Sequence, residues 1–374
     1  MAERDEEAVG ANGFAQLPLT VAHPFPGEFV DKLLGRPDAA RKLAQMVASM
    51  SEKLSPADAL AIAAHARALA PDDGYVWQLT DPAVRAHFAA WHWVIVNVES
   101  RNRVYDRAVR ENIGPDSVVL EIGTGTGILA MMAARAGAKH VYTIEVVPAI
   151  AEAARRNIAA NGFADRVTVI AKDANDVEIG EDIPERCNVF LHEIVDNILL
   201  GEAILPLTRT AREKLLTEGA VMLPERIWAS GMLVDYARAD CPRGPVTQWD
   251  GIDLSAIDLF APSTKPLRAD RRGDTALTAP TRLIEFDLRG EYALETEGIE
   301  APMVLTAEGA PNGLVQWIGF GFPGGLDYEV DEDEKHAWST LFHPLGDQPV
   351  RAAGDEVTLR VDHNHLLMGF SLPR

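Results

Sequence analysis

The sequence predicts an α/β sheet of parallel strands followed by an antiparallel β domain, with a helical segment in front of both. Three observations support this fold class. A strand, a glycine-rich loop, a helix and a second strand follow one another in residues 118–145, the order found in nucleotide-binding parallel sheets. Short alternating apolar runs between Gly, Pro and Asp clusters fill the chain from Ile227 onward, which is typical of antiparallel strands. Alanine-rich segments with helical spacing precede both.

The composition limits the function classes. The chain has 374 residues and a net charge of −21, which argues against a general nucleic-acid or membrane surface. An acidic surface suits a basic substrate, although solubility explains it equally well. Cys187 and Cys241 have neither metal-ligand nor disulfide spacing, which fits a reducing compartment. The polar first residues and the lack of a long apolar run predict a cytoplasmic protein with no nucleic-acid or membrane partner.

The N-terminal part is predicted to be a flexible tail, residues 1–25, followed by a helical hairpin, residues 26–88. The first helix of the hairpin spans residues 39–54. The second begins after Ser55, which can cap it, with Pro56 at its first position. The alanine-rich pattern resembles a single tetratricopeptide-type helix pair. An accessory hairpin is favoured over a docking array, because one repeat cannot form a solenoid.

Residues 89–224 are predicted to form the parallel, Rossmann-like domain. Val118–Ile122 is a short apolar run bounded by glycine, which indicates a buried strand. Ile128–Ala136 indicates a helix, which Gly137 can end, and His140–Ile144 a second buried strand. The third, fourth and fifth strands are expected at Val167–Ile170, at 188–191 and in the segment that ends near Pro224.

The glycine spacing in this domain discriminates between cofactors. The loop reads G-x-G-x-G rather than the dinucleotide pattern G-x-G-x-x-G. S-adenosylmethionine has no pyrophosphate to place against the helix, so it is favoured over NAD or FAD and over a loop without a ligand. The predicted cofactor-binding residues of the loop and the strand before it are Glu121, Gly123, Thr124, Gly125 and Gly127.

Two further positions extend the predicted cofactor site. Glu145 ends the second strand, where a carboxylate can accept from both ribose hydroxyls. The turn Asp173, Ala174 and Asn175 follows the third strand. Its carboxylate can accept from the adenine amino group and its backbone N–H can reach a ring nitrogen. Asn175 is the alternative for the side-chain role, with Asp173 favoured.

Residues 91–110 are predicted to be an extended entry or strand followed by a helix. Arg101 and Tyr105 lie four residues apart and therefore on one helix face. Arginine here can bind the carboxylate of the cofactor's methionine part in a bidentate pair. A surface arginine is the alternative.

The loop after the fourth strand carries three acids. Glu193 and Glu202 are nine residues apart, with Asp196 between them. Such acids suit general acid/base chemistry, a metal or a bound cation. The sequence HEIVD lacks the second histidine of a zinc motif, so no metal is predicted. A planar guanidinium, whose fork of donors two carboxylates can hold from both edges, is the best match. Solvated loop acids are the alternative.

Residues 225–374 are predicted to form an antiparallel β-barrel. Three features in it carry open alternatives. Residues 362–365, DHNH, can be a metal site or a hairpin turn, with the turn favoured. The acidic run 331–334 is a solvated loop. Trp338, near His336 and His343, can lie at an active-site mouth or in the barrel core.

From about Trp91 to its end, the chain resembles the protein arginine methyltransferases. Five features coincide in order: ESRNRVY at 99–105, LEIGTGTG, the strand-end Glu145, the loop HEIVDNILLGE, and LPERI before the barrel. WDGIDLS at 249–255 is similar to a barrel segment of that family. HAW at 336–338 stands where the family has Thr-His-Trp. Ala337 replaces the family's histidine, and the aromatic pattern before Arg101 also departs from the family.

The resemblance implies a mechanism and an assembly. Glu193 and Glu202 would be catalytic and hold the substrate guanidinium, with Asp196, His336 and Trp338 on the substrate side. Asp196 would either touch the guanidinium or cap the next helix. The loop is most similar to the monomethylating branch, so an arginine-containing protein or peptide would be monomethylated. A homodimer is expected, through an arm at residues 236–248. The rivals are a methyltransferase for a small molecule or another side chain and a weakly active cofactor-binding scaffold.

Overall fold

The computed structural model describes residues 36–50, 53–87, 91–236, 248–253, 256, 262–267, 274–330 and 338–373. The chain divides into two compact units. Residues 1–93 and 147–153 form the first unit, and residues 94–146 and 154–374 the second.

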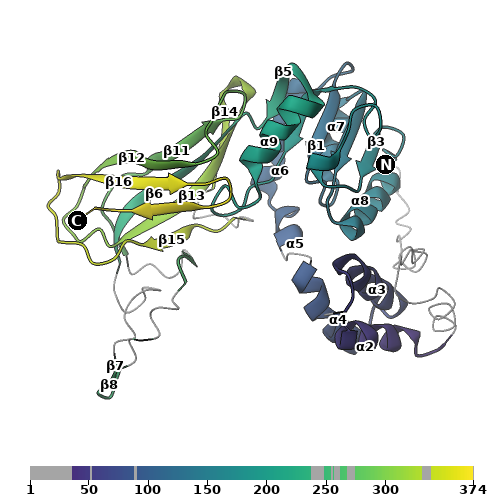
Figure 1. The fold of residues 1–374 in the computed structure, drawn as a ribbon, viewed down its shortest axis with the longest axis horizontal. Helices are drawn as coiled ribbons and strands as arrows, with labels where there is room; N and C mark the ends of the chain where they lie inside the picture. Colours follow the sequence, from purple (N-terminus) through teal and green to yellow (C-terminus); the bar gives the residue numbers. More distant parts are fainter. Residues whose placement is uncertain are drawn as a thin grey trace, which may run out of the picture. The chain divides into compact units, whose positions relative to one another are not determined.

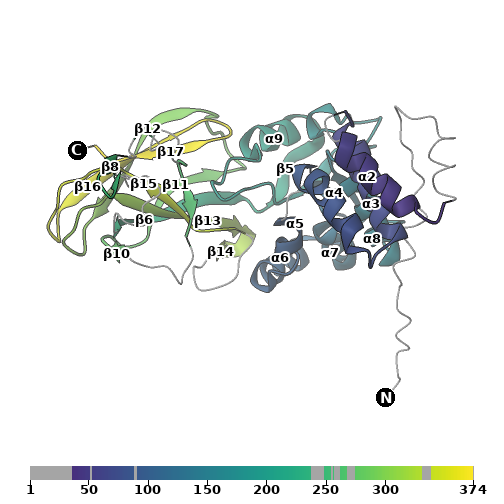
Figure 2. The same cartoon turned by 90° about the horizontal axis from the view of Figure 1, so that it is seen from below.

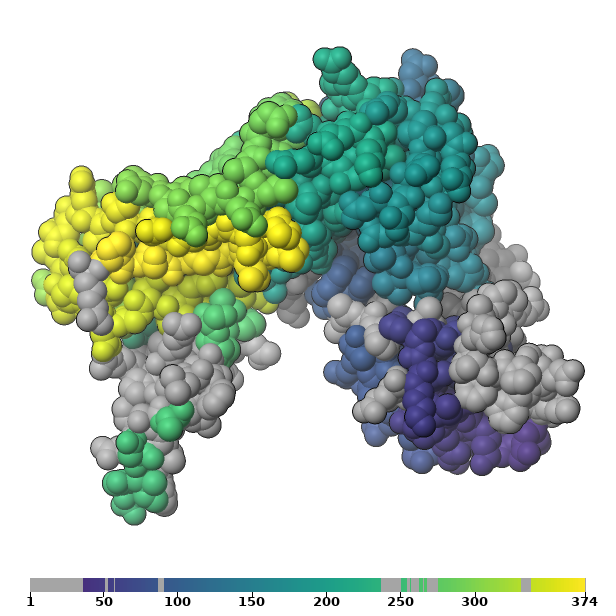
Figure 3. Space-filling model, viewed as in Figure 1, coloured from purple at the N-terminus to yellow at the C-terminus, as the bar shows by residue number. Residues whose placement is uncertain are grey.

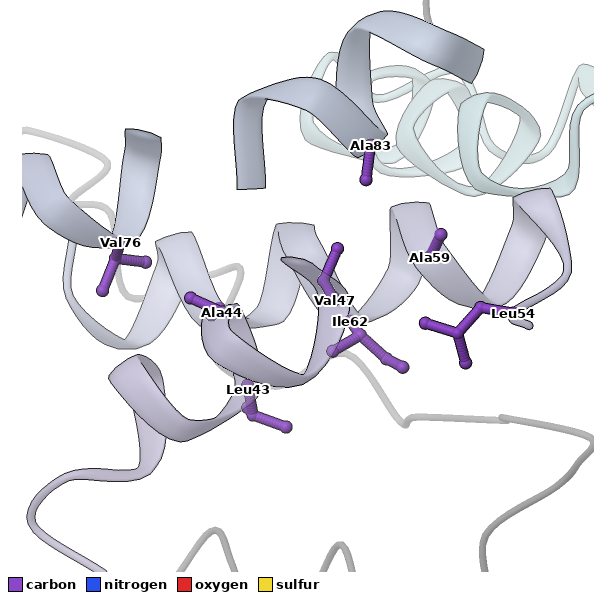
Figure 4. Close-up of a cluster of buried hydrophobic side chains, with 9 residues drawn as sticks. Leu43, Ala44, Val47, Leu54, Ala59, Ile62, Val76 and Ala83 are labelled. Carbon is purple, nitrogen blue, oxygen red and sulfur yellow. The ribbon is translucent and has the colours of Figure 1, made fainter. Parts of the chain in front are cut away.

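Three helices lie wholly within the first unit among its described residues: α2 (Ala39–Met50), α3 (Pro56–Leu69) and α4 (Gly74–His87). The predicted cap of α3 is confirmed, because the Ser55 side chain accepts from the Asp58 backbone N–H at 3.1 Å. Helix α2 ends at Met50, four residues before the predicted end. All three helices contribute to one apolar cluster (Figure 4), whose buried members are Leu43, Ala44, Val47, Leu54, Ala59, Ile62, Ala66, Val76 and Ala83.

Helix α4 corrects the predicted hairpin, because this unit has a third helix that the sequence did not indicate. Pro82 lies inside α4, and proline and threonine in a short segment argue locally against a helix. The Thr80 hydroxyl is satisfied by donating to the Val76 carbonyl at 2.9 Å. Val76 and Ala83 bury their side chains in the cluster with α2 and α3. Packing therefore outweighs local propensity here.

The predicted strand or extended entry at Trp91 is wrong. Residues Trp91–Ile95 form a short helix, α5, in which the rings of Trp91 and His92 stack with centroids 3.8 Å apart. Tryptophan and β-branched residues favour strands only where a neighbouring strand pairs with them, and this segment has no such neighbour among the described strands. The predicted helix that follows is confirmed as α6 (Glu99–Asn112).

In the second unit, α6 is followed by a parallel five-stranded sheet of order β3-β2-β1-β4-β5 (Figure 1). Its strands are β1 (Val118–Ile122), β2 (His140–Ile144), β3 (Val167–Ile170), β4 (Cys187–His192) and β5 (Leu216–Leu223). Helices α7 (Ile128–Ala136), α8 (Pro148–Ala160) and α9 (Ile204–Thr210) follow β1, β2 and β4 along the chain. Residues 148–153 of α8 belong to the first unit, and α9 continues as the π-helix η3 (Ala211–Leu215). The predicted Rossmann-like sheet is confirmed, and the first three strands have the predicted bounds.

The predicted antiparallel domain follows β5 and resolves into two main sheets. The larger sheet contains β6 (Arg226–Tyr236), β9 (Lys265–Pro266), β10 (Asp274–Ala276), β11 (Thr281–Asp287), β13 (Gly313–Phe322), β14 (Leu326–Glu329) and β15 (Leu341–Pro344). The smaller contains β12 (Thr296–Val304), β16 (Glu356–His363) and β17 (Met368–Ser371). Figure 2 shows β13 and β14 next to each other. In Figure 3 the green and yellow segments that include β12 and β16 lie side by side.

A separate hairpin, β7 (Gln248–Trp249) and β8 (Ile252–Asp253), carries the start of the WDGIDLS segment. Several predicted features lie outside the described residues: the tail 1–25, residues 237–247 of the expected arm, the acidic run 331–334, His336 and Ala337. In the part of the chain that the structure describes, no helix combines the length and apolarity required to cross a bilayer.

Candidate active site

The glycine loop joins β1 to α7 at the carboxyl edge of the parallel sheet. Gly123 has φ 86°, a left-handed conformation that favours glycine. A Cβ at Gly123 would lie 2.9 Å from the side chain of Ile194. Ile194 directly follows Glu193, so the first glycine is also required for the acidic loop to pack against the cofactor loop.

Glu145 lies at the end of β2 and is 7% exposed. Its carboxylate accepts from the Gly125 backbone N–H at 3.0 Å. This contact joins the two features from which the sequence predicted a cofactor site. The carboxylate therefore lies at the glycine loop, as a residue that binds a ribose there would.

Glu121 is the most deeply buried acid of this edge, at 1% exposure. Its Oε2 accepts from the Thr143 hydroxyl, and Thr143 is also 2.6 Å from the hydroxyl of Thr124. Oε1 has no hydrogen-bond partner among the described residues. Burial raises the pKa of Glu121 to about 8. A buried oxygen without a donor suits an ammonium group, which S-adenosylmethionine carries on its methionine part.

The turn after β3 forms the 3₁₀ helix η2 (Ala174–Asp176). Asp173 caps it by accepting from the backbone N–H and the side-chain amide of Asn175, each at 2.9 Å. The Asn175 carboxamide oxygen accepts from the Thr210 hydroxyl at 3.1 Å. The nitrogen and the oxygen of the Asn175 side-chain amide both already form hydrogen bonds. Asp173 is therefore the better placed of the two residues to bind an adenine through its side chain.

Arg101 and Glu193 form a buried bidentate ion pair. Arg101 Nε donates to Glu193 Oε1 at 2.6 Å, Nη2 donates to Oε2, and Nη1 donates to the Asn102 side chain at 2.7 Å. The side chains are 2% and 7% exposed. Burial is the largest effect on the pKa of Arg101 and acts to lower it, but the charge of Glu193 and the hydrogen bonds to it together raise that pKa. The arginine is therefore held charged against Glu193.

This pair differs from the predicted arrangement, which gave Arg101 to the cofactor and Glu193 to the substrate. The two opposite charges are both buried at one edge of the sheet, and pairing is the arrangement that compensates their loss of hydration. Tyr105 supports the pair from the same helix face. Its ring lies 4.8 Å from the Arg101 guanidinium carbon, and its hydroxyl donates to the His192 carbonyl at 3.0 Å.

Glu202 ends the acidic loop and has no hydrogen-bond or ion-pair partner in the described part of the chain. Burial, and then the charges of Asp196, Glu193 and Glu145, raise the pKa of Glu202 to about 7. An acid in this environment is stabilised as the carboxylate by any cation that reaches it. The site therefore combines one carboxylate that is already paired with one that is not.

Asp196 lies between the two glutamates and holds the loop together. Its Oδ1 accepts from the backbone N–H groups of Ile198 and Gly201 at 3.1 and 3.0 Å. Both groups precede α9, so Asp196 fixes the loop and does not cap that helix. A Cβ at Gly201 would lie 2.1 Å from Asp196 Oδ2, so the loop needs glycine there.

The antiparallel domain bonds to the same loop. The Trp338 indole, 6% exposed, donates to the Val195 carbonyl at 2.9 Å. The Ser339 N–H donates to the Asn197 side chain at 2.7 Å, and Gln316 donates to the Asn197 carbonyl at 3.2 Å. Trp338 thus combines both predicted alternatives, since it is buried and also contacts the acidic loop. Asn197, Gln316 and Thr143 are not among the residues that the sequence predicted for the site.

Among the residues with a described position, no group of three or more His, Cys, Asp or Glu side chains is arranged to hold a metal ion. The candidate segment DHNH lies at the end of β16 and in the turn after it. Asp362 Oδ1 accepts from the Gly298 backbone N–H and from Arg360 Nε, at 2.6 and 3.1 Å. This agrees with the turn interpretation.

Sequence comparisons relate the chain to methyltransferases. A family model described as ribosomal protein L11 methyltransferase (PrmA) matches residues 104–238. The arginine N(omega)-methyltransferase of Streptomyces achromogenes subsp. streptozoticus is 34% identical over 291 residues, which are 77% of this chain and 80% of the relative. Protein arginine N-methyltransferase 7 of Drosophila grimshawi is 35% identical over 223 residues, 53% of this chain and 30% of that protein.

Two solved structures share the fold. One is the Trypanosoma brucei PRMT1 enzyme-prozyme heterotetrameric complex with AdoHcy, with a TM-score of 0.65 and 23% identity over 75% of this chain and 89% of that one. The other is protein arginine methyltransferase 10 of Arabidopsis thaliana, with a TM-score of 0.61 and 21% identity over 76% of this chain and 91% of that one.

Proposed function

The chain belongs to the S-adenosylmethionine-dependent arginine N-methyltransferase family, and we propose that it places a single methyl group on arginine side chains of proteins or peptides. The observation that carries the proposal is the acidic loop at the carboxyl edge of the sheet. Glu193 is fixed there by Arg101, and Glu202 is half-buried with no partner among the described residues. A guanidinium, with donors on both edges, can satisfy Glu202 while it lies against Glu193.

The residues around the glycine loop fit the cofactor. When bound, S-adenosylmethionine supplies a methyl group that is activated by a positively charged sulfur. Glu145 would hold the ribose, and Asp173 and the Ala174 backbone the adenine. Glu121 would accept from the ammonium group, because its Oε1 is buried without a donor. The ammonium charge also offsets the high local density of carboxylates.

Arg101 can bind the cofactor carboxylate without releasing Glu193. A guanidinium has five N–H donors, and the contacts to Glu193 and Asn102 use three of them. The remaining hydrogens on Nη1 and Nη2 are the ones available to the cofactor. We therefore assign Arg101 both tasks: it holds Glu193 in place and contributes to the cofactor site.

Glu202 would act on the reacting nitrogen. A guanidinium is a poor nucleophile because its lone pairs are delocalised, and a carboxylate held close to it concentrates the positive charge on the other nitrogens. Methylation releases one proton from the guanidinium. Burial favours the protonated form of Glu202, so this carboxylate is suited to accept that proton.

The same geometry supports monomethylation. Each methyl group replaces an N–H donor of the guanidinium. Glu202 has no other donor among the described residues, so a methylated guanidinium leaves it short of a partner, at a cost of about 1–3 kcal/mol. The product is then expected to leave rather than to react again. Mass spectrometry of a modified peptide tests this, and asymmetric dimethylarginine as the main product at long reaction times would overturn it.

Free arginine is a second candidate substrate. The relative that matches along four fifths of its length is named arginine N(omega)-methyltransferase, without mention of a protein substrate. Turnover with a radiolabelled methyl donor, on an arginine-rich peptide and on free L-arginine in parallel, separates the two. Cofactor binding by calorimetry without turnover on either would instead support a scaffold role.

We also propose a homodimer, formed through an arm at residues 236–248. The proposal rests on the family's arm position alone, since residues 237–247 are outside the described part of the chain. Sedimentation tests it, and a monomer at micromolar concentration would exclude it.

A further inference from the structure

Gln316 is an amide in a strand that is otherwise apolar. It lies in β13, whose ten residues are all buried, and is itself 0% exposed. Side chains alternate between the faces of a strand, so Gln316 shares its face with Leu314, Ile318 and Phe320. Burial of an amide is unfavourable unless its donor and acceptor are bonded. The hydrogen-bond partners of Gln316 therefore indicate its role.

The amide bridges a histidine and the acidic loop. Gln316 Nε2 donates to the Asn197 carbonyl, and His343 Nε2 lies 3.2 Å from Gln316 Oε1. Since the Gln316 nitrogen is the donor toward Asn197, its oxygen accepts from His343, whose Nε2 must carry the hydrogen. Burial lowers the pKa of His343 to about 4, so the ring is neutral at ordinary pH.

The hydrogen-bonded chain from His343 through Gln316 ends at Asn197, which lies between the two glutamates in the sequence of the loop. Asn197 is bonded twice by the antiparallel domain, through its carbonyl by Gln316 and through its side chain by the Ser339 N–H. The Trp338 indole donates to the carbonyl of Val195, two residues before Asn197. The central part of the loop is thus fixed by the antiparallel domain, while Glu193 is fixed by Arg101 from the other side.

The same strand face also supports the other end of the loop. Phe322 contacts the Tyr105 ring edge-on, with centroids 5.0 Å apart, and the Tyr105 hydroxyl bonds to His192 just before Glu193. An apolar side chain at position 316 would continue this face but would leave the Asn197 carbonyl without its donor. Gln316 thus lies at the position from which a side chain can donate to the Asn197 carbonyl.

We propose that Gln316, oriented by His343, is a positioning residue for methyl transfer, which sets the place of Glu202 relative to Glu193 through the backbone of Asn197. The inference rests on the proposed function of that loop. Neither side chain touches the substrate; both act through the loop.

The test compares Gln316→Leu, His343→Phe and the double variant with the full-length protein. Thr278→Val is the matched control, because it removes another buried hydrogen bond of the antiparallel domain, from the Leu233 N–H to the Thr278 hydroxyl at 3.0 Å, without contact to the loop. Each protein is assayed for Tm, S-adenosylmethionine affinity, and kcat and KM on an arginine-rich peptide. Glu202→Gln serves as the inactive reference.

We expect Gln316→Leu to lower kcat about 10- to 100-fold, the range for a small displacement of a catalytic group, with the cofactor affinity unchanged. Thr278→Val should lower Tm by a similar amount but keep kcat. The double variant should be no slower than Gln316→Leu alone, because His343 acts through Gln316.

Wild-type kcat in Gln316→Leu, or kcat losses that multiply in the double variant, would overturn the inference while leaving the proposed function intact. If Gln316→Leu does not fold, His343→Phe decides: wild-type kcat in that variant overturns the proposal. Absence of turnover in the wild-type protein on peptide and free arginine would instead refute the proposed function, and this inference with it.

Discussion

At the residue scale, the site is dominated by acids whose pKa values are changed by burial. Glu121 and Glu202 have pKa values raised to about 8 and about 7, with burial as the largest cause for both. The two groups suit two different cations, the ammonium of the cofactor and the guanidinium of the substrate. Binding of either cation favours the ionised carboxylate, so binding and proton release are coupled.

The first prediction concerns Glu202 and pH. The carboxylate must be ionised to hold a guanidinium. Its pKa in the folded protein is raised to about 7, so the inactive protonated form dominates below that pH. We expect kcat/KM for an arginine peptide to rise with pH and to level off above about 8. A kcat/KM that is flat between about pH 6 and 8 would show that Glu202 is not the titrating group.

Glu202→Gln tests the same residue by mutation. The amide removes the negative charge and places N–H groups toward the guanidinium, so we expect a loss of turnover of at least about 100-fold. Cofactor affinity should stay within about twofold, because Glu202 is assigned to the substrate alone. Glu213→Gln, on the exposed surface, is the control for a general charge effect. Near-native turnover in Glu202→Gln would refute the assignment.

Glu145→Ala should weaken S-adenosylmethionine binding. Loss of charge-assisted hydrogen bonds to the ribose costs about 1.5–3 kcal/mol, which calorimetry measures directly. Glu185→Ala, whose side chain is 63% exposed and pairs with Lys139, is the matched control. Unchanged affinity in Glu145→Ala, with an intact fold, would mean that the acid at the end of β2 does not bind the cofactor.

The sequence predicted which acids gather at this edge, because parallel strands bring their carboxyl ends together. It did not predict their pairing. Arg101 and Glu193 are 92 positions apart, and which partner the guanidinium takes depends on the rotation of α6 over the sheet. The hydrogen bond from Thr143 to Glu121 was also not predictable, since a threonine within a strand usually serves only as a β-branched residue.

At the element scale, the acidic loop is shaped by its own side chains as well as by its neighbours. Asp196 bonds to Ile198 and Gly201, and Gly201 leaves the space that the Asp196 carboxylate fills. The predicted substrate role of Asp196 stays a prediction.

Gly201→Ala is expected to disturb this loop. The new Cβ would lie 2.1 Å from Asp196 Oδ2, so the carboxylate must leave its two N–H donors. We expect a loss of about 1–3 kcal/mol in the free energy of unfolding and a larger loss in kcat than in cofactor affinity. Gly114→Ala, where a Cβ meets nothing within 4 Å, is the control. Full activity of Gly201→Ala would show that the loop tolerates a displaced Asp196.

Elements were predictable where local pattern and packing agree. The strands β1 to β3 are short apolar runs bounded by glycine or polar turns, and their ends match the prediction. Helices α4 and α5 contain Pro82 and a Trp-rich run, so local propensity pointed away from the helix that packing selects. Gln316 and Asn197 are 119 positions apart, and no local pattern predicts such a contact.

At the scale of the whole molecule, histidines and glutamates whose pKa values burial shifts in opposite directions determine how stability depends on pH. Burial lowers the pKa of His192 and His343 from 6.5 to about 4. Their protonation in the unfolded chain makes the folded state less stable as pH falls below 6.5. Glu121 and Glu202 are shifted upward from 4.5, so the folded state binds more protons than the unfolded one and loses stability as pH rises toward 8.

Above about pH 7 the histidines are mostly neutral in both states, so the effect of the acids dominates. We therefore expect the Tm of the protein without cofactor to fall by a few degrees between about pH 7 and 8. Glu121→Gln, which removes the group with the higher pKa, should show a smaller fall over the same range. In the wild-type protein, saturating S-adenosylmethionine should also reduce the fall, because its ammonium favours the ionised form of Glu121. Thermal unfolding followed by circular dichroism measures all three. A Tm that rises from pH 7 to 8, or a Glu121→Gln variant with the same pH dependence as the wild type, would show that these acids do not titrate in this range.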